Sequence, residues 1–483
     1  MSRPAEPQPT GAITAPGLIR SLTLRDLVLF HIVAVVSLRW LATAGAAGPS
    51  SITLWILAAL FFFIPQGLAV SELATRYPDA GGIYEWTKRA YGEGHGFLCG
   101  WCYWVNNVLY PPNILMATAV IATYALGKAD SGLASSWSYV LPMTLGMLWF
   151  AVAVNIVGVS SGKWLQNVGA FGTFVPGVIL IGLGGYALTQ GPAATPMHFK
   201  DLVPDLGNFS EINLWASIAF AFAGLELAPV MAGETKDPSR TLRQSILIAA
   251  PFILGIYILG TIAVLTLVPS HDVNIVAGPL QAIAAGAGKI GVGAGWLAAA
   301  CAAFVVVGNL GGIGAWLAGP ARVALMIGLD RYFPPAFGKI HPKWKTPYMA
   351  ILIQALFATA VLFVSVLGKG TTVEKAYLVV LDTMLLIYFI PYIYMFLAYL
   401  KFTRLDSSPT AGPVKRWLVA GSGLLLTVLA MIVAMVPPSD TPSVLLFELK
   451  VAGGALFFVA LGGVLYWRAI RAGRQDGPTG HPA

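Results

Sequence analysis

Twelve long runs of apolar residues follow one another along this chain of 483 residues. Each has about twenty residues or more, the length at which a helix spans a hydrocarbon core of roughly 30 Å. Only 10% of the residues are charged, whereas soluble domains carry roughly a quarter. The pattern predicts an all-α integral membrane protein with twelve transmembrane helices. Their approximate extents are 26–46, 52–75, 97–127, 138–157, 165–189, 212–232, 244–269, 293–326, 348–367, 374–400, 415–437 and 446–467.

The positions of the Lys and Arg residues support this count of spans. Cytoplasmic loops of membrane proteins hold an excess of these residues. With the N-terminus inside, the predicted cytoplasmic loops and both tails hold twenty-two of the 29 Lys and Arg residues, the opposite side holds six, and the last is Arg39. We expect a multi-pass protein of the cytoplasmic membrane with both termini in the cytoplasm and the lipid bilayer around it. The same excess explains the net charge of +8 without a nucleic acid partner.

The tails and short motifs predict no further domain or chemistry. Residues 1–24 and 471–483 are largely polar and contain several prolines and glycines, so we expect disordered cytoplasmic tails. The CGWC at residues 99–102 lacks the strand and helix context of a redox motif, and packing is its favoured role. Gly308 and Gly312 are expected to allow close contact between helices. No cofactor, metal or enzymatic activity is predicted.

Two spans, the first and the sixth, are interrupted in the middle. The first contains SLRWLATAGAAGPSS, in which a charge, small residues and a proline replace a continuous apolar helix. The sixth contains AFAFAGLELAPV, which places Gly224, Glu226 and a proline at membrane depth. Arg39 lies fourteen residues after Arg25, at the cytoplasmic end of its span, and Glu226 lies fourteen after Leu214, near the outer end of its span. At ~1.5 Å per residue both reach the middle of the membrane, from opposite sides.

Interrupted spans in corresponding positions are typical of transporters built from two inverted repeats, such as those with the leucine-transporter fold. A broken helix frees backbone N–H and C=O groups, which can bind a carboxylate or a cation. We expect a first repeat of five spans over residues 25–189, a second over 190–400, and two additional helices over 401–470. The broken spans are the predicted binding site.

Three motifs are similar to those of the amino acid-polyamine-organocation (APC) superfamily. SELATRYPDAGGIYEW at residues 71–86 resembles the loop after that family's second span. AFAGLELAPVMAGETKDPSR at 221–240 resembles its sixth span and the following cytoplasmic motif. ARVALMIGLDRYFPPAFGKIHPKWKTPY at 321–348 resembles the loop after its eighth span. Their order and spacing match the family over about 440 residues.

The resemblance implies a secondary transporter of amino acids, working as a proton-coupled symporter or as an exchanger by alternating access. Spans eleven and twelve would lie outside the core. Two alternatives stay open. One is an exchanger of polyamines or other cationic amines, and the other is a nutrient sensor that keeps the fold without transporting.

The first span departs from the family pattern, which is rich in glycine at the break. The aligned residues here are Ser37, Leu38, Arg39, Trp40 and Leu41. Three roles are open for Arg39. Its guanidinium could bind a substrate carboxylate in place of the glycine N–H groups, it could stand where sodium binds in related transporters and pair with Glu226, or the pair could be purely structural.

The coupling ion is expected to involve acidic residues at membrane depth. Glu226 is the main candidate for carrying a proton, because a buried carboxylate is costly to leave charged. Thr173 lies near the position where some proton-coupled relatives have a lysine, so it permits a sodium ligand, although Arg39 favours a built-in positive charge. Asp382 in the tenth span is another buried acid and a possible partner for Arg39.

The third span carries a polar stripe of Tyr103, Asn106, Asn107 and Tyr110 at helical spacing, which must turn inward in lipid. Tyr103 also matches a substrate-side aromatic residue of the family's arginine–agmatine exchanger. The candidate substrate-binding residues are Ser37, Leu38, Arg39, Trp40, Tyr103, Asn107, Phe220, Phe222, Ala223, Gly224 and Glu226, and the candidate coupling residues are Arg39, Glu226, Thr173 and Asp382. For Trp40, Phe220 and Phe222, packing is the alternative role.

Overall fold

The computed structural model of the chain describes residues 18, 20–129, 131–205, 207, 215, 217–291, 293–366, 373–405, 412–436 and 444–473. Within this part of the chain ten helical segments are long and apolar enough to cross a membrane, and Tyr348–Val364 is a shorter apolar helix. The predicted all-α, multi-pass membrane protein is therefore confirmed. The count of twelve spans stays a prediction, because the sixth run lies partly outside the described residues. Most of the two predicted tails also lies outside the described residues, so their disorder stays a prediction.

Most of the predicted spans correspond to one continuous helix. These helices are α6 (Glu93–Ala125), α7 (Trp137–Ile156), α8 (Val159–Gln190), α11 (Pro238–Leu267), α13 (Ala294–Leu329), α14 (Tyr348–Val366), α15 (Val373–Leu405), α16 (Pro413–Val433) and α17 (Val444–Gly473). The second span consists of α3 (Ser50–Ala58), a π-helical turn η1 (Ala59–Phe63) and α4 (Ile64–Arg76). Two helices lie outside the predicted spans, α5 (Ile83–Tyr91) and α12 (Gly278–Lys289).

The first span is divided, as predicted. It consists of α1 (Leu24–Val35) and α2 (Arg39–Ala46), with residues 36–38 between them. Of the sixth span, the structure describes helical residues 217–221, α10 (Leu227–Val230) and a 3-10 turn η4 (Ala232–Glu234). Short 3-10 turns elsewhere are η2 (Leu133–Ser135), η3 (Phe199–Leu202), η5 (Ser270–Asp272) and η6 (Pro335–Gly338).

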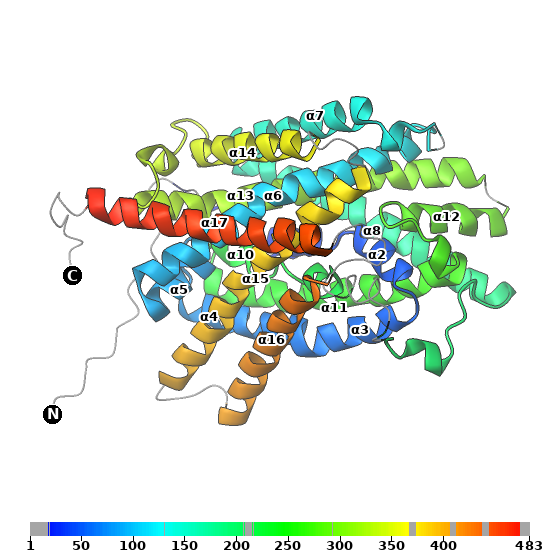
Figure 1. Cartoon of the computed structure of the whole chain (residues 1–483), viewed down its shortest axis with the longest axis horizontal. Helices are drawn as coiled ribbons and strands as arrows, with labels where there is room; N and C mark the ends of the chain where they lie inside the picture. The colour runs from blue at the N-terminus through cyan, green and yellow to red at the C-terminus, as the bar shows by residue number, and fades with distance from the viewer. Residues whose placement is uncertain are drawn as a thin grey trace.

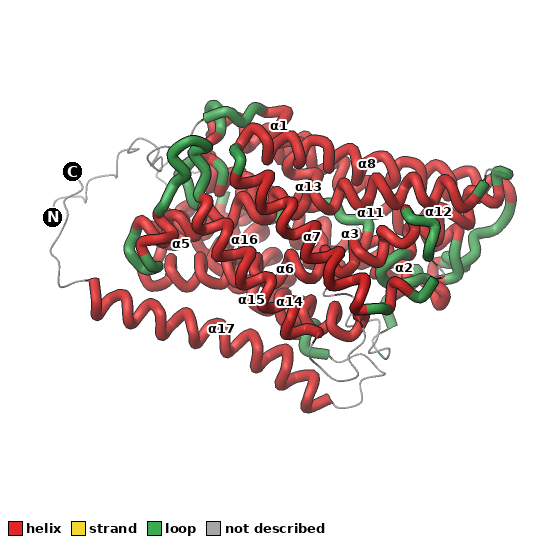
Figure 2. The backbone as a smooth tube through the Cα atoms, turned by 90° about the horizontal axis from the view of Figure 1, so that it is seen from above, coloured by secondary structure: helices red, strands yellow, loops and turns green. Residues whose placement is uncertain are grey.

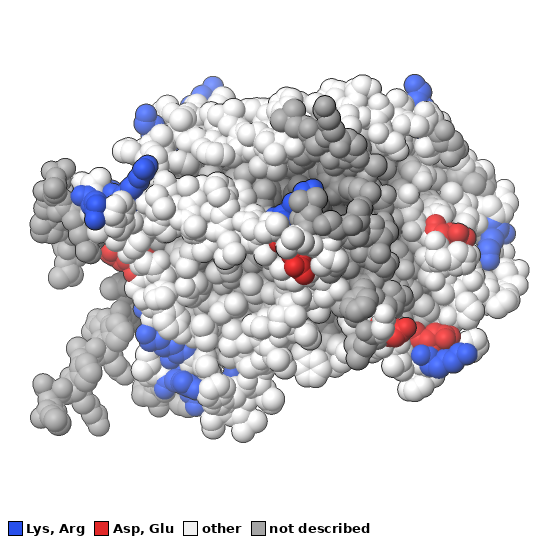
Figure 3. Space-filling model, viewed as in Figure 1, with Lys and Arg blue, Asp and Glu red and all other residues white. Residues whose placement is uncertain are grey.

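Most of the long helices run roughly along the long axis of the molecule, with α5 and the last turns of α17 at one end and α12 at the other (Figure 1). Helix α17 lies along the outside of the bundle (Figure 2), where it contacts α15 and α6. On the face shown in Figure 3, many charged side chains lie towards the two ends, and the surface between them is uncharged except for one basic and one acidic group near its centre. This distribution suits a molecule whose long axis crosses a bilayer.

Glycines bring α8 and α13 into backbone contact. A Cβ placed on Gly172 would lie 2.6 Å from the backbone nitrogen of Gly308, and one on Gly169 would lie 2.6 Å from the Cα of Gly311. The expected role of Gly308 in close helix contact is thus confirmed. Gly312 approaches α1 instead, since its Cβ would lie 3.0 Å from the carbonyl oxygen of Val33. The first span is therefore held close to this helix pair.

A buried ion pair joins the end of the sixth span to α13. Arg322 donates from Nε and Nη2 to the carboxylate of Glu234, at 2.9 and 2.8 Å, and both side chains are almost fully buried. The backbone oxygen of Glu234 accepts from the N–H groups of Ser21 and Leu22, at 2.9 Å each. The last residues of the predicted tail, just before α1, are therefore hydrogen-bonded to the end of the sixth span.

Helix α5 is anchored by charges at the same end of the molecule. Lys88 pairs with Asp330 after α13, and Arg89 pairs with Asp79 at 2.8 Å. Glu85, in the first turn of the same helix, is only 4% exposed. Burial raises the pKa of Glu85 to about 7, although the nearby Lys88 opposes this shift.

This burial predicts a pH-dependent effect of Glu85→Gln on stability. Because the pKa of Glu85 is about 7 in the folded protein and 4.5 in an ordinary glutamate, ionising Glu85 destabilises the fold as pH rises from about 4.5 to above 7. At pH 8 the variant should therefore melt about 2 °C higher than wild type, for a chain of this size. At pH 5 the difference should be much smaller. Thermal unfolding of purified protein in detergent measures this. An equal change at both pH values would contradict the assigned cause.

Candidate functional site

The break in the first span is held open by two side chains from other helices. Trp316 on α13 donates from its indole Nε1 to the carbonyl oxygen of Ala34 at 2.8 Å. The Tyr257 hydroxyl on α11 lies 2.6 Å from the carbonyl oxygen of Val35 and accepts from the N–H of Ser37 at 3.4 Å. Backbone groups that lose their helical partners must be satisfied by other means in a membrane. Here the side chains supply those partners.

The break in the sixth span lies beside the first. Residues 222–226 separate the helical residues 217–221 from α10. Gly224 has a φ of +127°, a conformation that a residue with a Cβ adopts only under strain. Tyr257 also lies 3.0 Å from the carbonyl oxygen of Ala221, so one hydroxyl connects the two breaks.

Glu226 ends this second break and its carboxylate is fully buried. Five donors surround it. Gly224 N–H and Gln66 Nε2 donate to one oxygen at 3.1 Å each, together with the Tyr392 hydroxyl, and the hydroxyls of Tyr388 and Tyr103 donate to the other, Tyr103 at 3.3 Å. We call these five residues the carboxylate cage. None of its members is a cation, so the hypothesised ion pair of Glu226 with Arg39 is not formed in this structure.

Arg39 lies at the first residue of α2 and is 2% exposed. Its Nη1 donates to the Oδ1 of Asn113 on α6. The guanidinium carbon lies 4.1 Å from the ring centre of Trp40 and 5.5 Å from that of Tyr110. Such contacts stabilise a buried guanidinium through the electron-rich ring faces. The cation is thus fixed by α6 and by aromatic rings.

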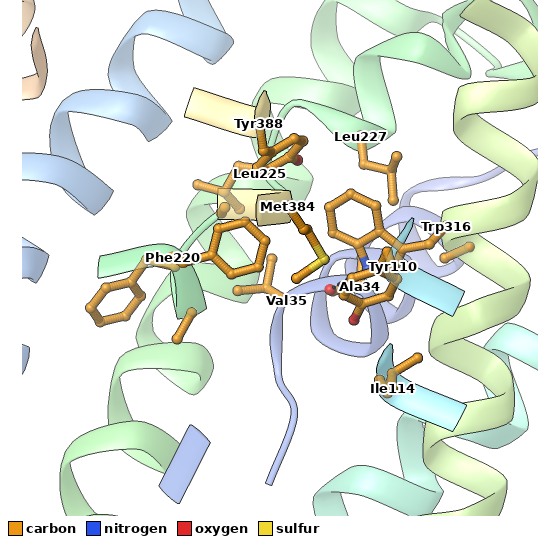
Figure 4. Packing of buried hydrophobic residues seen from close by; sticks show 14 of the residues in the cluster. Ala34, Val35, Tyr110, Ile114, Phe220, Leu225, Leu227, Trp316, Met384 and Tyr388 are labelled. Carbon is orange, nitrogen blue, oxygen red and sulfur yellow. Dashed lines mark hydrogen bonds between the residues drawn. The ribbon is translucent and has the colours of Figure 1, made fainter. Parts of the chain in front are cut away.

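A chain of aromatic contacts connects Arg39 with the carboxylate cage. Tyr110 packs on Trp316 with ring centres 4.9 Å apart, and Trp316 contacts Tyr388 at 5.8 Å. A second route passes from Trp40 through Phe220 to Tyr388, at 5.7 and 5.4 Å. Figure 4 shows Phe220, Met384, Tyr110 and Trp316 around Val35 at the break of the first span. A cation and a carboxylate therefore lie at opposite ends of one aromatic cluster.

The model of the amino acid permease family matches residues 22–456 of the chain. The chain belongs to this family. An uncharacterized transporter of Legionella pneumophila is 30% identical over 449 residues, which cover 91% of this chain and 95% of that protein. A probable agmatine/putrescine antiporter of Lactococcus lactis is 25% identical over 453 residues, with 91% and 93% covered.

Comparison with a solved structure identifies the fold of this permease. The crystal structure of MhsT in complex with L-phenylalanine gives a TM-score of 0.62 at 15% identity, and the match covers 89% of this chain and 99% of that one. At this identity the likeness concerns the fold alone. With the family match it confirms the predicted APC superfamily and leucine-transporter fold. The permease is a multi-pass membrane protein, and its named relatives are transporters.

Several predicted site residues of this permease lie around the two breaks. Arg39, Trp40, Tyr103, Phe220, Gly224 and Glu226 belong to the cluster or the cage, while Ser37, Leu38 and Ala223 are buried at the breaks. The polar stripe of α6 is buried as predicted, and Asn107 on it donates from Nδ2 to the carbonyl oxygen of Tyr103 at 2.7 Å.

Two of the predicted residues also pack against other helices, and the side chain of a third is not described. Phe222 begins the second break and contacts Tyr257 at 5.4 Å, while its ring also stacks on Phe63 at 4.7 Å and contacts Trp55. A Cβ placed on Gly308 would lie 2.5 Å from the Thr173 hydroxyl, so Thr173 is part of the contact between α8 and α13. Asp382 lies in α15, but its side chain is outside the described part of the structure.

Six residues of the site were missed from the sequence: Gln66, Asn113, Tyr257, Trp316, Tyr388 and Tyr392. Three of them had a usable signal. Tyr388 and Tyr392 are four residues apart and therefore share one face of an apolar helix, and Gln66 is a lone amide within an apolar span, which in lipid needs an internal partner. Among the described residues, no group of three or more His, Cys, Asp or Glu side chains could hold a metal ion.

Proposed function

We propose that this permease is a secondary transporter that moves an amino acid across the cytoplasmic membrane by alternating access. Transport would be driven by a proton gradient or by exchange. The observation that carries the proposal is the pair of helix breaks, with Arg39 beside one and Glu226 beside the other, joined by aromatic side chains. An α-amino acid carries a carboxylate and an ammonium group, for which a guanidinium and a carboxylate are the complementary partners.

The same geometry suggests how binding would be linked to transport. Helices broken at the midplane form the substrate site in transporters of inverted repeats, and one repeat rocks against the other around it. The repeats proposed for this chain are residues 25–189 and 190–400, with both termini in the cytoplasm. Tyr257 contacts both breaks, so a substrate bound at one break would affect the other.

The test is uptake into proteoliposomes that contain the purified permease. A panel of labelled amino acids and their decarboxylated amines is offered with an inward proton gradient, without a gradient, and with unlabelled substrate inside. Gradient-driven or counterflow uptake of an amino acid is expected. Binding without any uptake or exchange would contradict transport and would favour a nutrient sensor.

A polyamine or cationic amine exchanger is the second candidate. It is favoured by the likeness to a probable agmatine/putrescine antiporter and by the carboxylate cage, whose tyrosine rings and Glu226 suit an ammonium group. Counterflow of diamines with no uptake of any amino acid would select this alternative.

A further inference from the structure

A cavity of about 460 Å³ lies between the end of α4 and the first turns of α11. It is lined by Thr75 from α4 and by Ser239, Arg240, Arg243, Gln244 and Leu247 from α11. The Thr75 hydroxyl lies 3.5 Å from the carbonyl oxygen of Ser239, where the two helices meet. The cavity lies next to the end of the molecule where Leu22 pairs with Thr235.

The polar part of the cavity is positively charged. Arg240 and Arg243 are exposed, and in the described part of the chain neither takes part in an ion pair or in a side-chain hydrogen bond. Lys236 is exposed two residues before α11. In the sequence, Asp237 is the single acidic residue between Lys236 and Arg243. The N-terminal end of α11 adds the positive end of its helix dipole. An anionic group is therefore favoured here.

The other part of the cavity is apolar and continues onto the outer surface of α11. Arg240, Arg243, Gln244 and Leu247 are three or four residues apart and share one face of the helix. Leu247 is 61% exposed, and Phe252 farther along α11 is 48% exposed. In a helix that is apolar enough to span a membrane, such side chains face lipid tails. The ligand that fits has an anionic head and apolar chains.

We propose that this cavity binds the phosphate group of an anionic phospholipid from the adjoining leaflet. Arg240 and Arg243 hold the phosphate oxygens by charge-assisted hydrogen bonds, and the acyl chains lie along Leu247 and the following turns of α11. Basic pockets between transmembrane helices bind the headgroups of anionic lipids in other membrane proteins. A soluble phosphate would use the same arginines but would gain nothing from Leu247.

The experiment measures lipid retention, independently of transport. Purified permease is incubated with phosphatidylglycerol or phosphatidylcholine and bound lipid is counted by native mass spectrometry. Wild type should retain phosphatidylglycerol in preference to phosphatidylcholine. Arg240→Gln/Arg243→Gln should reduce retention about 10-fold, which corresponds to losing charged hydrogen bonds. Leu247→Gln should weaken phosphatidylglycerol retention as well.

The matched control is Arg331→Gln/Lys339→Gln, which removes the same charge from exposed positions outside the cavity. This control should retain the lipid as wild type does, with both double variants checked for an unchanged melting temperature. Equal retention by wild type and Arg240→Gln/Arg243→Gln, or equal retention of phosphatidylcholine, would overturn the proposal. Displacement of the lipid by millimolar glycerol phosphate would identify a site for soluble anions instead.

Discussion

Glu226→Gln is expected to abolish uptake driven by a proton gradient while exchange of substrate persists. The carboxylate is fully buried and accepts five hydrogen bonds. A glutamine keeps the shape and one acceptor oxygen, and the tyrosine hydroxyls can rotate to accept from its amide. The fold of the cage should therefore survive, but the group can no longer gain or lose a proton. In proteoliposomes, gradient-driven uptake should fall to the level of empty liposomes, with counterflow retained.

The control for this variant is Glu448→Gln, which removes a carboxylate from α17, outside the core of the bundle. It should leave both modes of uptake unchanged. If Glu226→Gln retains the pH dependence of wild type, Glu226 does not carry the coupled proton. If counterflow is lost too while the melting temperature is unchanged, the carboxylate acts in substrate binding.

The fold and the positions of the two helix breaks could be predicted because they depend on local properties of the sequence. The apolar runs require helices in a bilayer, and a charge or a glycine with proline within such a run marks a break. Both breaks lie where Arg39 and Glu226 predicted them, and the structure shows that they are neighbours. Helix α12 was missed, because its short apolar stretch has neither the length of a span nor the charges of a loop.

The partners within the site could not be predicted, since they come from helices far apart in the chain. The donors to Glu226 are 123 to 166 residues away for Tyr103, Gln66, Tyr388 and Tyr392. A pair of Arg39 with Glu226 was one of the roles left open by the sequence. Instead, the hydroxyls of three tyrosines on two other helices donate to the carboxylate, and no local pattern connects these tyrosines with Glu226. The buried pair of Arg322 with Glu234 was missed for the same reason.

Arg39→Lys is expected to weaken the binding of amino acids strongly and to leave decarboxylated amines unaffected. The guanidinium lies over Trp40 and donates to Asn113, and its planar fork can bind a carboxylate through two parallel hydrogen bonds. A lysine keeps the charge but loses the fork and the stacking. Loss of a charged hydrogen bond predicts about a 10- to 100-fold weaker affinity for carboxylate substrates. Competition for labelled substrate in proteoliposomes compares each amino acid with its amine.

Arg25→Lys is the matched control, because it makes the same chemical change at the exposed start of α1 and should alter neither affinity. Equal losses for amino acids and amines in Arg39→Lys would rule out a carboxylate ligand. Two roles would then remain for Arg39, a substitute for the coupling cation and a purely structural residue, and they differ in their response to sodium. If Arg39 replaces a coupling cation, Arg39→Gln should make uptake depend on added sodium, because the vacated positive charge would then be supplied by the ion. A purely structural Arg39 predicts a lower melting temperature and no such dependence, so the two readouts together assign the residue.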